Sequence, residues 1–259
     1  IISDIKYSHN TIFKFWLAKS YLNESKIIIT DHGGAYGRID GSNQIIEDIS
    51  HKSFLYNKTN LKNSFHVPVI HQFKKRGNST LTELLMITHG ICKYPHYATT
   101  SPVSGQALDQ IEITKKFYDQ LSDKIKSNFY IRPYQNEGWS LNQRYSDIFN
   151  SEKILIDKKK FEKIFKISKL IISTYPKTSF YESFLSGPSI LLVNFDHFKI
   201  DKKFDELHDV LKKNKMLFEN STEASLFVSS VWENINDWWY SKESQDALKI
   251  FNSYLAYEK

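Results

Sequence analysis

Cysteine, glycine and proline are scarce in this chain, and each shortage excludes a class of protein. The 259 residues include one cysteine, which excludes a disulfide framework and any zinc site built from several cysteines. Nine glycines and six prolines are below average usage and exclude a collagen-like or low-complexity chain. No apolar run approaches the roughly 20 residues that a membrane-spanning helix needs. What remains is a globular chain that is long enough to bury a large core.

Several familiar catalytic motifs are missing as well. The sequence contains no HExxH pair, no P-loop, no G-x-G-x-x-G and no G-x-S-x-G. Zinc-hydrolase, ATPase, dehydrogenase and serine-hydrolase functions therefore lose their usual sequence support, and we expect no metal site.

The charge balance is basic without forming a nucleic-acid signature. Lysine and arginine number 35 against 29 acidic residues, for a net charge of +6. The lysines are scattered or lie in short runs with acidic residues between them, which is typical of a solvated surface. We expect no nucleic-acid partner. An anionic small molecule or an anionic membrane surface is the main alternative.

Short β-rich runs alternate with helical periods along the chain. This alternation predicts an α/β fold with a mostly parallel sheet, whose ligands bind outside the carboxyl ends of the strands. The expected strands are 26–30, 81–88, 129–132, 169–173, 189–194 and 215–218. The expected helices are 10–21, 106–125, 161–167, 179–186, 203–211, 221–239 and 242–257.

A glycine-rich loop follows the first buried strand, with the sequence Asp31-His32-Gly33-Gly34-Ala35-Tyr36-Gly37. Adjacent glycines let the backbone turn sharply and approach a ligand. His32 is placed to act as a general base or to donate to an oxyanion or phosphate. The alternative is a plain turn with a structurally bonded histidine.

A second candidate segment follows the strand 169–173 and opens a helix. Its sequence, 173–182, contains Lys177, Thr178, Ser179 and Glu182. Free N–H groups at a helix N-terminus attract phosphate, and the lysine and hydroxyls add to this attraction. Glu182 could accept hydrogen bonds from ribose. Equally, Thr178 or Ser179 is the N-cap and Glu182 its capping-box partner.

Two weaker candidates lie at other strand ends. Arg132 ends the strand 129–132, with Glu137 close behind, and an arginine there can bind phosphate or carboxylate or form a surface ion pair. His89 follows the strand 81–88.

Taken in order, these motifs resemble a bacterial family of surface-polysaccharide transferases, associated with O-antigen and first noted in Leptospira. The resemblance rests on Tyr7-Ser8-His9-Asn10, the glycine loop, Arg132-Pro133-Tyr134 with Gly138-Trp139, the segment 174–188 and the closing Trp232 and Trp238-Trp239. It covers about residues 3–254. Because family proteins are about twice this length, it implies that most of the amino-terminal domain is absent.

The resemblance implies a GT-B-like architecture of two Rossmann-like domains. Residues 1–56 would be the tail of the amino-terminal, acceptor-side domain, and residues 57–259 the carboxy-terminal domain that binds the nucleotide sugar. The implied function is transfer of a sugar from a nucleotide-activated donor to a polysaccharide or lipid-linked glycan, in the cytoplasm or at the inner face of the membrane. No cofactor is implied, and a metal is not required, because helix dipoles and basic side chains offset the diphosphate charge.

The resemblance also implies residue roles. Lys177, Thr178, Ser179 and Arg132 would bind the donor phosphates, and Glu182 the ribose. His32 would stabilise the leaving phosphate or activate the acceptor hydroxyl, with Asp31 as the competing base. Two alternatives stay open: a non-catalytic or truncated module that binds sugar nucleotide or polysaccharide, and a nucleotide-sugar epimerase with the same architecture.

Overall fold

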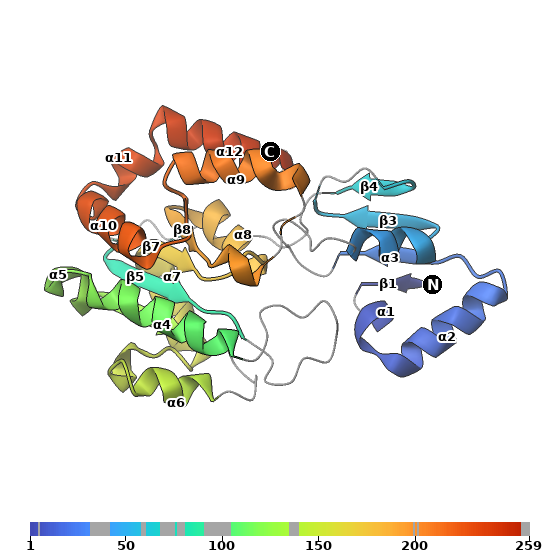
Figure 1. Ribbon diagram of the computed structural model, residues 1–259, viewed down its shortest axis with the longest axis horizontal. Helices are drawn as coiled ribbons and strands as arrows, with labels where there is room; N and C mark the ends of the chain where they lie inside the picture. The colour runs from blue at the N-terminus through green and yellow to red at the C-terminus, as the bar shows by residue number, and fades with distance from the viewer. Residues whose placement is uncertain are drawn as a thin grey trace.

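The computed structural model contains two parallel β-sheets in separate lobes (Figure 1). It describes residues 1–4, 6–31, 42–57, 61–67, 76, 81–90, 105–134, 140–198, 200 and 202–254. Both sheets are formed by strands that run in one direction, so the predicted α/β class with parallel sheets is confirmed.

The first sheet has the order β1-β2-β3-β4 and is accompanied by three helices. Its strands are β1 (Ile2–Ser3), β2 (Ile28–Thr30), β3 (Lys52–Leu55) and β4 (Ser64–His66). The helices are α1 (Lys6–His9), α2 (Thr11–Leu22) and α3 (Ser42–Ile49). Asn10 caps α2: its side chain accepts a hydrogen bond from the Phe13 N–H at 2.8 Å.

The core of the first lobe is small. It consists of Leu17, Ile27, Ile29, Ile46 and Leu55, with a few partly buried neighbours. Since β4 pairs with β3 in this sheet, the sheet continues past residue 56, where the sequence led us to place the end of the first domain. The sequence missed α3, β3 and β4 because they are short and weakly apolar.

The second sheet has the order β6-β5-β7-β8-β9. Its strands are β5 (Glu83–Ile87), β6 (Phe129–Arg132), β7 (Ser168–Ser173), β8 (Ser189–Leu192) and β9 (Leu217–Phe218). The main helices are α4 (Gln106–Asp119), α5 (Asp123–Ser127), α6 (Leu141–Ser146), α7 (Lys158–Ile167), α8 (Thr178–Ser186), α9 (Asp205–Lys213), α10 (Ser221–Val231), α11 (Ile235–Trp239) and α12 (Lys242–Tyr254). Short 3-10 turns lie at η1 (Ser151–Lys153), η2 (Phe195–His197) and η3 (Lys202–Phe204).

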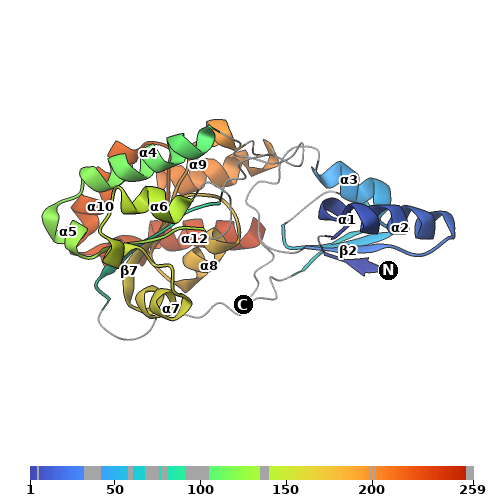
Figure 2. The same cartoon turned by 90° about the horizontal axis from the view of Figure 1, so that it is seen from below.

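Helices cover both faces of the second sheet (Figure 2). Leu84 and Met86 of β5 point into the core beneath α4 and α10, while Leu85 and Ile87 point the other way, toward α7. Strands buried on both faces read as continuous apolar runs, which explains why they were recognisable in the sequence. α8, α9 and α12 pack together around Phe180, Phe184 and Phe251.

Two long helices expected from the sequence are each broken. The expected helix 106–125 ends at Asp119 and restarts at Asp123, and the expected helix 221–239 ends at Val231 and restarts at Ile235. Apolar residues continue through both breaks, since Leu121 and Trp232 are buried. The apolar periodicity of the sequence therefore runs on through both points where the backbone changes direction, and it does not reveal the breaks. Leu108, an apolar residue within the expected helix 106–125, is 48% exposed.

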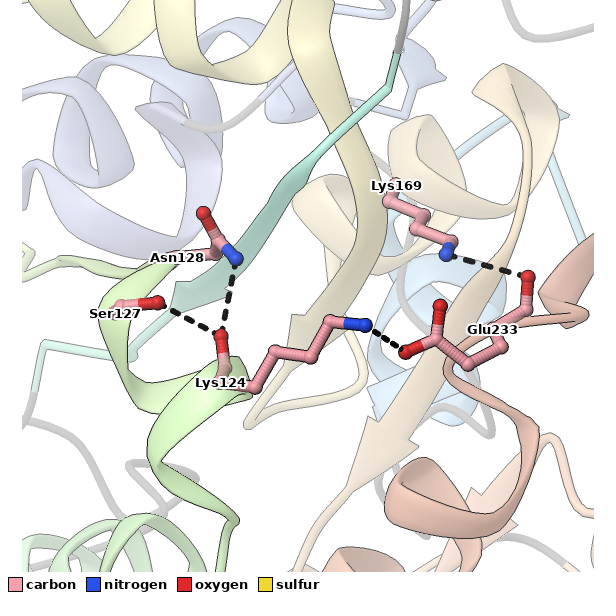
Figure 3. A network of polar contacts seen from close by, with 5 residues as sticks. All are labelled: Lys124, Ser127, Asn128, Lys169 and Glu233. Atoms are coloured by element: carbon pink, nitrogen blue, oxygen red, sulfur yellow. Dashed lines mark hydrogen bonds and ion pairs between the residues drawn. The ribbon is translucent and has the colours of Figure 1, made fainter.

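A polar network joins α5 and the start of β7 to the connection between α10 and α11 (Figure 3). The Lys124 Nζ lies 2.5 Å from Oε1 of Glu233, and the Lys169 Nζ donates to the Glu233 carbonyl at 3.4 Å. Lys169 stands near the start of β7, so this network lies at the amino end of the sheet. Lys124, Ser127 and Glu233 are exposed and Lys169 and Asn128 are half-buried, which makes the network a surface feature rather than part of the core.

Candidate functional site

The strand order of the second sheet reverses at β5. β6 pairs with one edge of β5 and β7 with the other, although both follow β5 in the chain. In open parallel sheets, ligands bind at such a switch point, beyond the carboxyl ends of the strands. The segments at this point are residues 88–90 after β5 and residues 174–177 after β7. They form the candidate site.

Backbone hydrogen bonds hold the two segments beside each other. The Thr174 N–H donates to the Ile87 carbonyl at 3.0 Å, and the Thr88 N–H donates to the Arg132 carbonyl at 3.0 Å. Thr88 and Thr174 are both buried. These bonds continue the pairing of the sheet past the strand ends. The backbone that carries the next side chains along each segment is therefore held in place.

Aromatic side chains from four strand ends converge on His89. Its ring stacks on that of Tyr175, with centroids 4.4 Å apart and planes 25° apart. Tyr134 and Phe198 approach the same imidazole, each at 6.2 Å. These residues follow β5, β7, β6 and β8 respectively. The cluster therefore brings together, at the carboxyl edge of the sheet, residues as far apart in the sequence as His89 and Phe198.

The charge state of this cluster is set by its burial. Burial, and secondarily the positive charge of Lys177, lowers the pKa of His89 to about 3, so the imidazole is neutral at physiological pH. Burial also raises the pKa of the Tyr175 hydroxyl, an effect that its hydrogen bond with Ser179 partly opposes. The negative charge of Glu182 contributes to that rise. The site therefore combines a neutral imidazole, a neutral phenol and one nearby cation.

Helix α8 begins at Thr178, and its N-cap is Lys177. The sequence predicted Thr178 or Ser179 as the cap; instead Lys177 has the extended backbone of a cap residue and makes no side-chain capping bond. The Phe180 N–H donates to the Lys177 carbonyl at 2.9 Å. In the part of the chain that the structure describes, no hydrogen bond starts from the N–H of Thr178 or Ser179. Two donors at a helix N-terminus thus remain to meet an anion.

The remaining predicted donor-site side chains divide between this site and other roles. The Ser179 hydroxyl is hydrogen-bonded to the Tyr175 hydroxyl, so it supports the cluster. Glu182 is half-buried on α8, within electrostatic reach of Tyr175. Lys177 is exposed.

Arg132 is directed elsewhere. Its Nη1 donates to the carbonyls of Leu155 and Ile156, and its guanidinium lies over the Phe161 ring, 5.0 Å from the centroid. Burial lowers its pKa, and the Asp157 carboxylate opposes that shift. The contacts therefore assign Arg132 to holding the loop before α7, in place of the phosphate-binding role expected from its position at a strand end.

Asp31 follows β2 in the first lobe, and its carboxylate is engaged. Its Oδ2 accepts the Tyr56 N–H at 2.7 Å, and its own N–H donates to the Phe54 carbonyl at 3.0 Å. These bonds tie the start of the glycine loop to the end of β3. The predicted His32, Gly33, Gly34, Tyr36 and Gly37, and the weaker candidate Glu137, lie outside the described residues.

A hydrogen bond between described residues links the first lobe to α8. The Tyr181 hydroxyl donates to Oδ1 of Asn57 at 3.3 Å, and both residues are buried. Asn57 follows β3, whereas Tyr181 lies in the first turns of the helix that opens at the candidate site. This contact places the end of the first sheet next to the element that would carry the donor.

Sequence reasoning missed the aromatic members of the site. Tyr134 and Tyr175 stand inside the segments that were singled out, but their rings gave no signal distinct from core packing. Arg76 was also missed: it is buried and donates to four backbone carbonyls and two serine hydroxyls at the opposite edge of the sheet. It stands alone in a polar segment, so only its three-dimensional contacts reveal its role.

Neither a metal cluster nor a membrane span is found in the described part of the chain. No group of three or more His, Cys, Asp or Glu side chains there could hold a metal ion. No helix there has both the length and the apolar character to cross a bilayer.

Comparison with protein families gives a match over nearly the whole chain. A family model described as LIC12162 family transferase matches residues 1–258. No curated protein sequence matches the chain.

Solved structures with the same architecture are distant in sequence. A Staphylococcus aureus TarM mutant in complex with Fondaparinux, alpha-GlcNAc-glycerol and UDP is 13% identical, with a TM-score of 0.52 over 89% of this chain and 48% of that one. S. aureus MnaA with UDP is 9% identical, with a TM-score of 0.50 over 91% and 70%. A Listeria monocytogenes protein described as a UDP-N-acetylglucosamine 2-epimerase is 11% identical, with a TM-score of 0.52 over 90% and 63%.

These structures establish the fold alone. They are GT-B glycosyltransferase and epimerase structures, so the GT-B-like α/β architecture expected from the sequence is confirmed. The chain spans about half the length of the TarM structure.

Proposed function

The chain belongs to the LIC12162 family of transferases, and from this premise we propose that it serves transfer of a sugar from a nucleotide-activated donor to a cell-surface polysaccharide such as O-antigen or capsule. The observation that carries the proposal is the pairing of the β5/β7 switch point with the N-terminus of α8, which has two N–H donors unoccupied among the described residues. Such a site suits a diphosphate. UDP in the TarM and MnaA structures of the same fold supports this choice of ligand.

Within this proposal, the phosphates bind at the N-terminus of α8. The N–H groups of Thr178 and Ser179 donate to phosphoryl oxygens, and Lys177 supplies positive charge beside them. Glu182, one turn further along α8, accepts hydrogen bonds from ribose. Because the helix dipole and Lys177 offset the phosphate charge, donor binding is expected to need no metal ion.

The acceptor side belongs to the first lobe. His32, which follows β2, would stabilise the leaving phosphate or activate the acceptor hydroxyl. Asp31 is the weaker base candidate, since its carboxylate already accepts the Tyr56 N–H. We place the reaction in the cytoplasm, at the inner face of the membrane, where a lipid-linked glycan acceptor is presented.

A thermal-shift panel tests the donor site. UDP, CMP, GDP, CDP and dTDP are added with and without Mg²⁺ to the wild type, to Glu182→Ala and to Glu162→Ala, an exposed glutamate on α7 that serves as a matched control. A ligand that binds the native state raises the melting temperature by mass action. We expect stabilisation by one nucleotide, independent of Mg²⁺, lost in Glu182→Ala and kept in Glu162→Ala. No shift with any nucleotide would contradict the site.

Two other functions are separated by product analysis. The Listeria structure described as a 2-epimerase favours the first, an epimerase, which would convert a nucleotide sugar with no acceptor present. The second is a non-catalytic binding module. Intact donor affinity with neither transfer nor epimerisation would identify it. Transfer that requires a glycan acceptor supports the transferase.

A further inference from the structure

His89 has a ring nitrogen without a partner. Its Nδ1 is enclosed, and within the described part of the chain neither ring nitrogen makes a hydrogen bond. The residue as a whole is nevertheless partly exposed. A buried polar atom without a partner in a native structure calls for an explanation, and here the atom stands at the switch point of the sheet.

The two nitrogens of His89 differ in what they can do. The neutral ring carries one proton, on either Nδ1 or Nε2. An N–H group enclosed without an acceptor is costlier and rarer than an enclosed lone pair without a donor. The cheaper arrangement leaves Nδ1 bare and puts the proton on Nε2. The Tyr175 stack holds the plane of the ring, so the direction of the Nε2–H bond is set before any ligand arrives.

The surroundings of this donor select an anionic acceptor. Lys177 is close enough for its charge to act on His89, and it is the N-cap of α8, where the helix dipole is positive. Tyr175, which stacks on His89, is bonded through its hydroxyl to Ser179 in the first turn of α8. Tyr175 thereby contacts both the imidazole of His89 and the first turn of α8.

We propose that neutral His89 donates a hydrogen bond from Nε2 to a phosphoryl oxygen of the nucleotide donor at the N-terminus of α8. This inference rests on the proposed donor site and adds to it a directional contact without added charge. The histidine fixes where the diphosphate lies, while Lys177 and the helix provide the attraction. Its role is to bind and orient the donor, and no proton is transferred.

Amide substitutions distinguish the two nitrogens. The side-chain amide of glutamine reaches close to the position of Nε2, and that of asparagine to the position of Nδ1. The affinity for UDP is measured by titration calorimetry for the wild type, His89→Gln, His89→Asn and His89→Phe. The phenylalanine variant keeps an aromatic ring against Tyr175 and removes both nitrogens. The melting temperature of each variant without ligand checks that it is folded.

We expect His89→Gln to bind UDP within about threefold of the wild type. His89→Asn and His89→Phe should lose about tenfold or more, as expected for one hydrogen bond to a charged group. Wild-type affinity in folded His89→Phe would overturn this inference alone. Retention in His89→Asn with loss in His89→Gln would also overturn it, by assigning the donor to Nδ1. A wild type that binds neither UDP nor any other nucleotide of the thermal-shift panel would overturn the inference together with the donor site beneath it.

Discussion

Arg76 is the most consequential buried cation in the described chain, and its replacement gives a sharp test of what holds the second lobe together. Arg76 is 7% exposed, and its guanidinium makes six hydrogen bonds. The strongest, from Nη2, reach the Pro188 carbonyl at 2.7 Å and the Ser189 hydroxyl at 2.8 Å. Others reach carbonyls at the start of β7 and near the end of α8. Arg76 thus closes the amino edge of the sheet and neutralises the negative end of the α8 dipole.

The size of the effect follows from the balance of two terms. Burial lowers the pKa of Arg76 to about 9, so the side chain is still charged at neutral pH and its desolvation is already a cost to the native state. Arg76→Met removes that cost but takes one donor from each of four backbone carbonyls. The Pro188 carbonyl keeps the Ile171 N–H, and the Ser183 carbonyl keeps two serine hydroxyls. The carbonyls of Ser168 and Lys169 lose this donor, and since a buried carbonyl without a donor costs about 1–3 kcal/mol, we expect a loss of about 3–5 kcal/mol in all. For a chain of this size, that lowers the melting temperature by roughly 6–20 °C.

Three variants measured by chemical and thermal unfolding test the reasoning. Arg76→Lys keeps the charge but loses the fork geometry, so we expect a loss of roughly half that of Arg76→Met. Arg144→Met, at an exposed position on α6, is the matched control and should stay within about 0.5 kcal/mol of the wild type. Equal stability of Arg76→Met and Arg144→Met would refute the assignment, because the desolvation cost would then cancel the hydrogen bonds.

Three further outcomes are expected. Gly187→Ala should cost about 1–3 kcal/mol in denaturant unfolding, because φ is +145° and the new Cβ would lie 3.4 Å from Cζ of Arg76; a neutral result would contradict this. Since the pKa of His89 is lower in the folded than in the unfolded chain, the unfolded state binds more protons below pH 6.5 and stability falls as pH falls. The slope from this residue is at most about 1.4 kcal/mol per pH unit, and a His89→Gln variant with the same acid sensitivity as the wild type would argue against it. Lys124→Ala breaks the exposed pair with Glu233, so we expect the melting temperature to move by less than about 2 °C, and by less still in high salt; a larger change would show that the network is structural.

The sequence was sufficient to predict the strands of the second sheet and, to within one residue, the start of α8. β5, β7 and β8 are short apolar runs, and strands buried on both faces leave that signature whatever their neighbours are. The order in which strands pair leaves no such trace. The switch point at β5, and hence the meeting of His89 with Tyr175, depends on pairing between segments more than 80 residues apart.

Arginine shows why candidate residues are harder to predict than strands. Arg132 stands at a strand end, the position expected of a phosphate binder, yet its guanidinium satisfies the carbonyls of Leu155 and Ile156. Arg76 follows no strand or motif, yet it is the better-connected side chain. In both cases the partner is a backbone carbonyl, and carbonyls carry no sequence signal. The sequence shows which residues carry a charge, but it does not show which groups their side chains contact.

The small core of the first lobe has a consequence for how the chain opens. Five buried side chains hold β1–β4, whereas the second sheet packs against two much larger clusters of buried side chains. Local opening should therefore cost less in the first lobe, and its strand amides should exchange with deuterium well before those of β5, β7 and β8. Asp31 belongs to the easily opened part and α8 to the durable part. Nucleotide that protects amides in the first lobe would then do so through Asn57 and Tyr181, the buried pair between them.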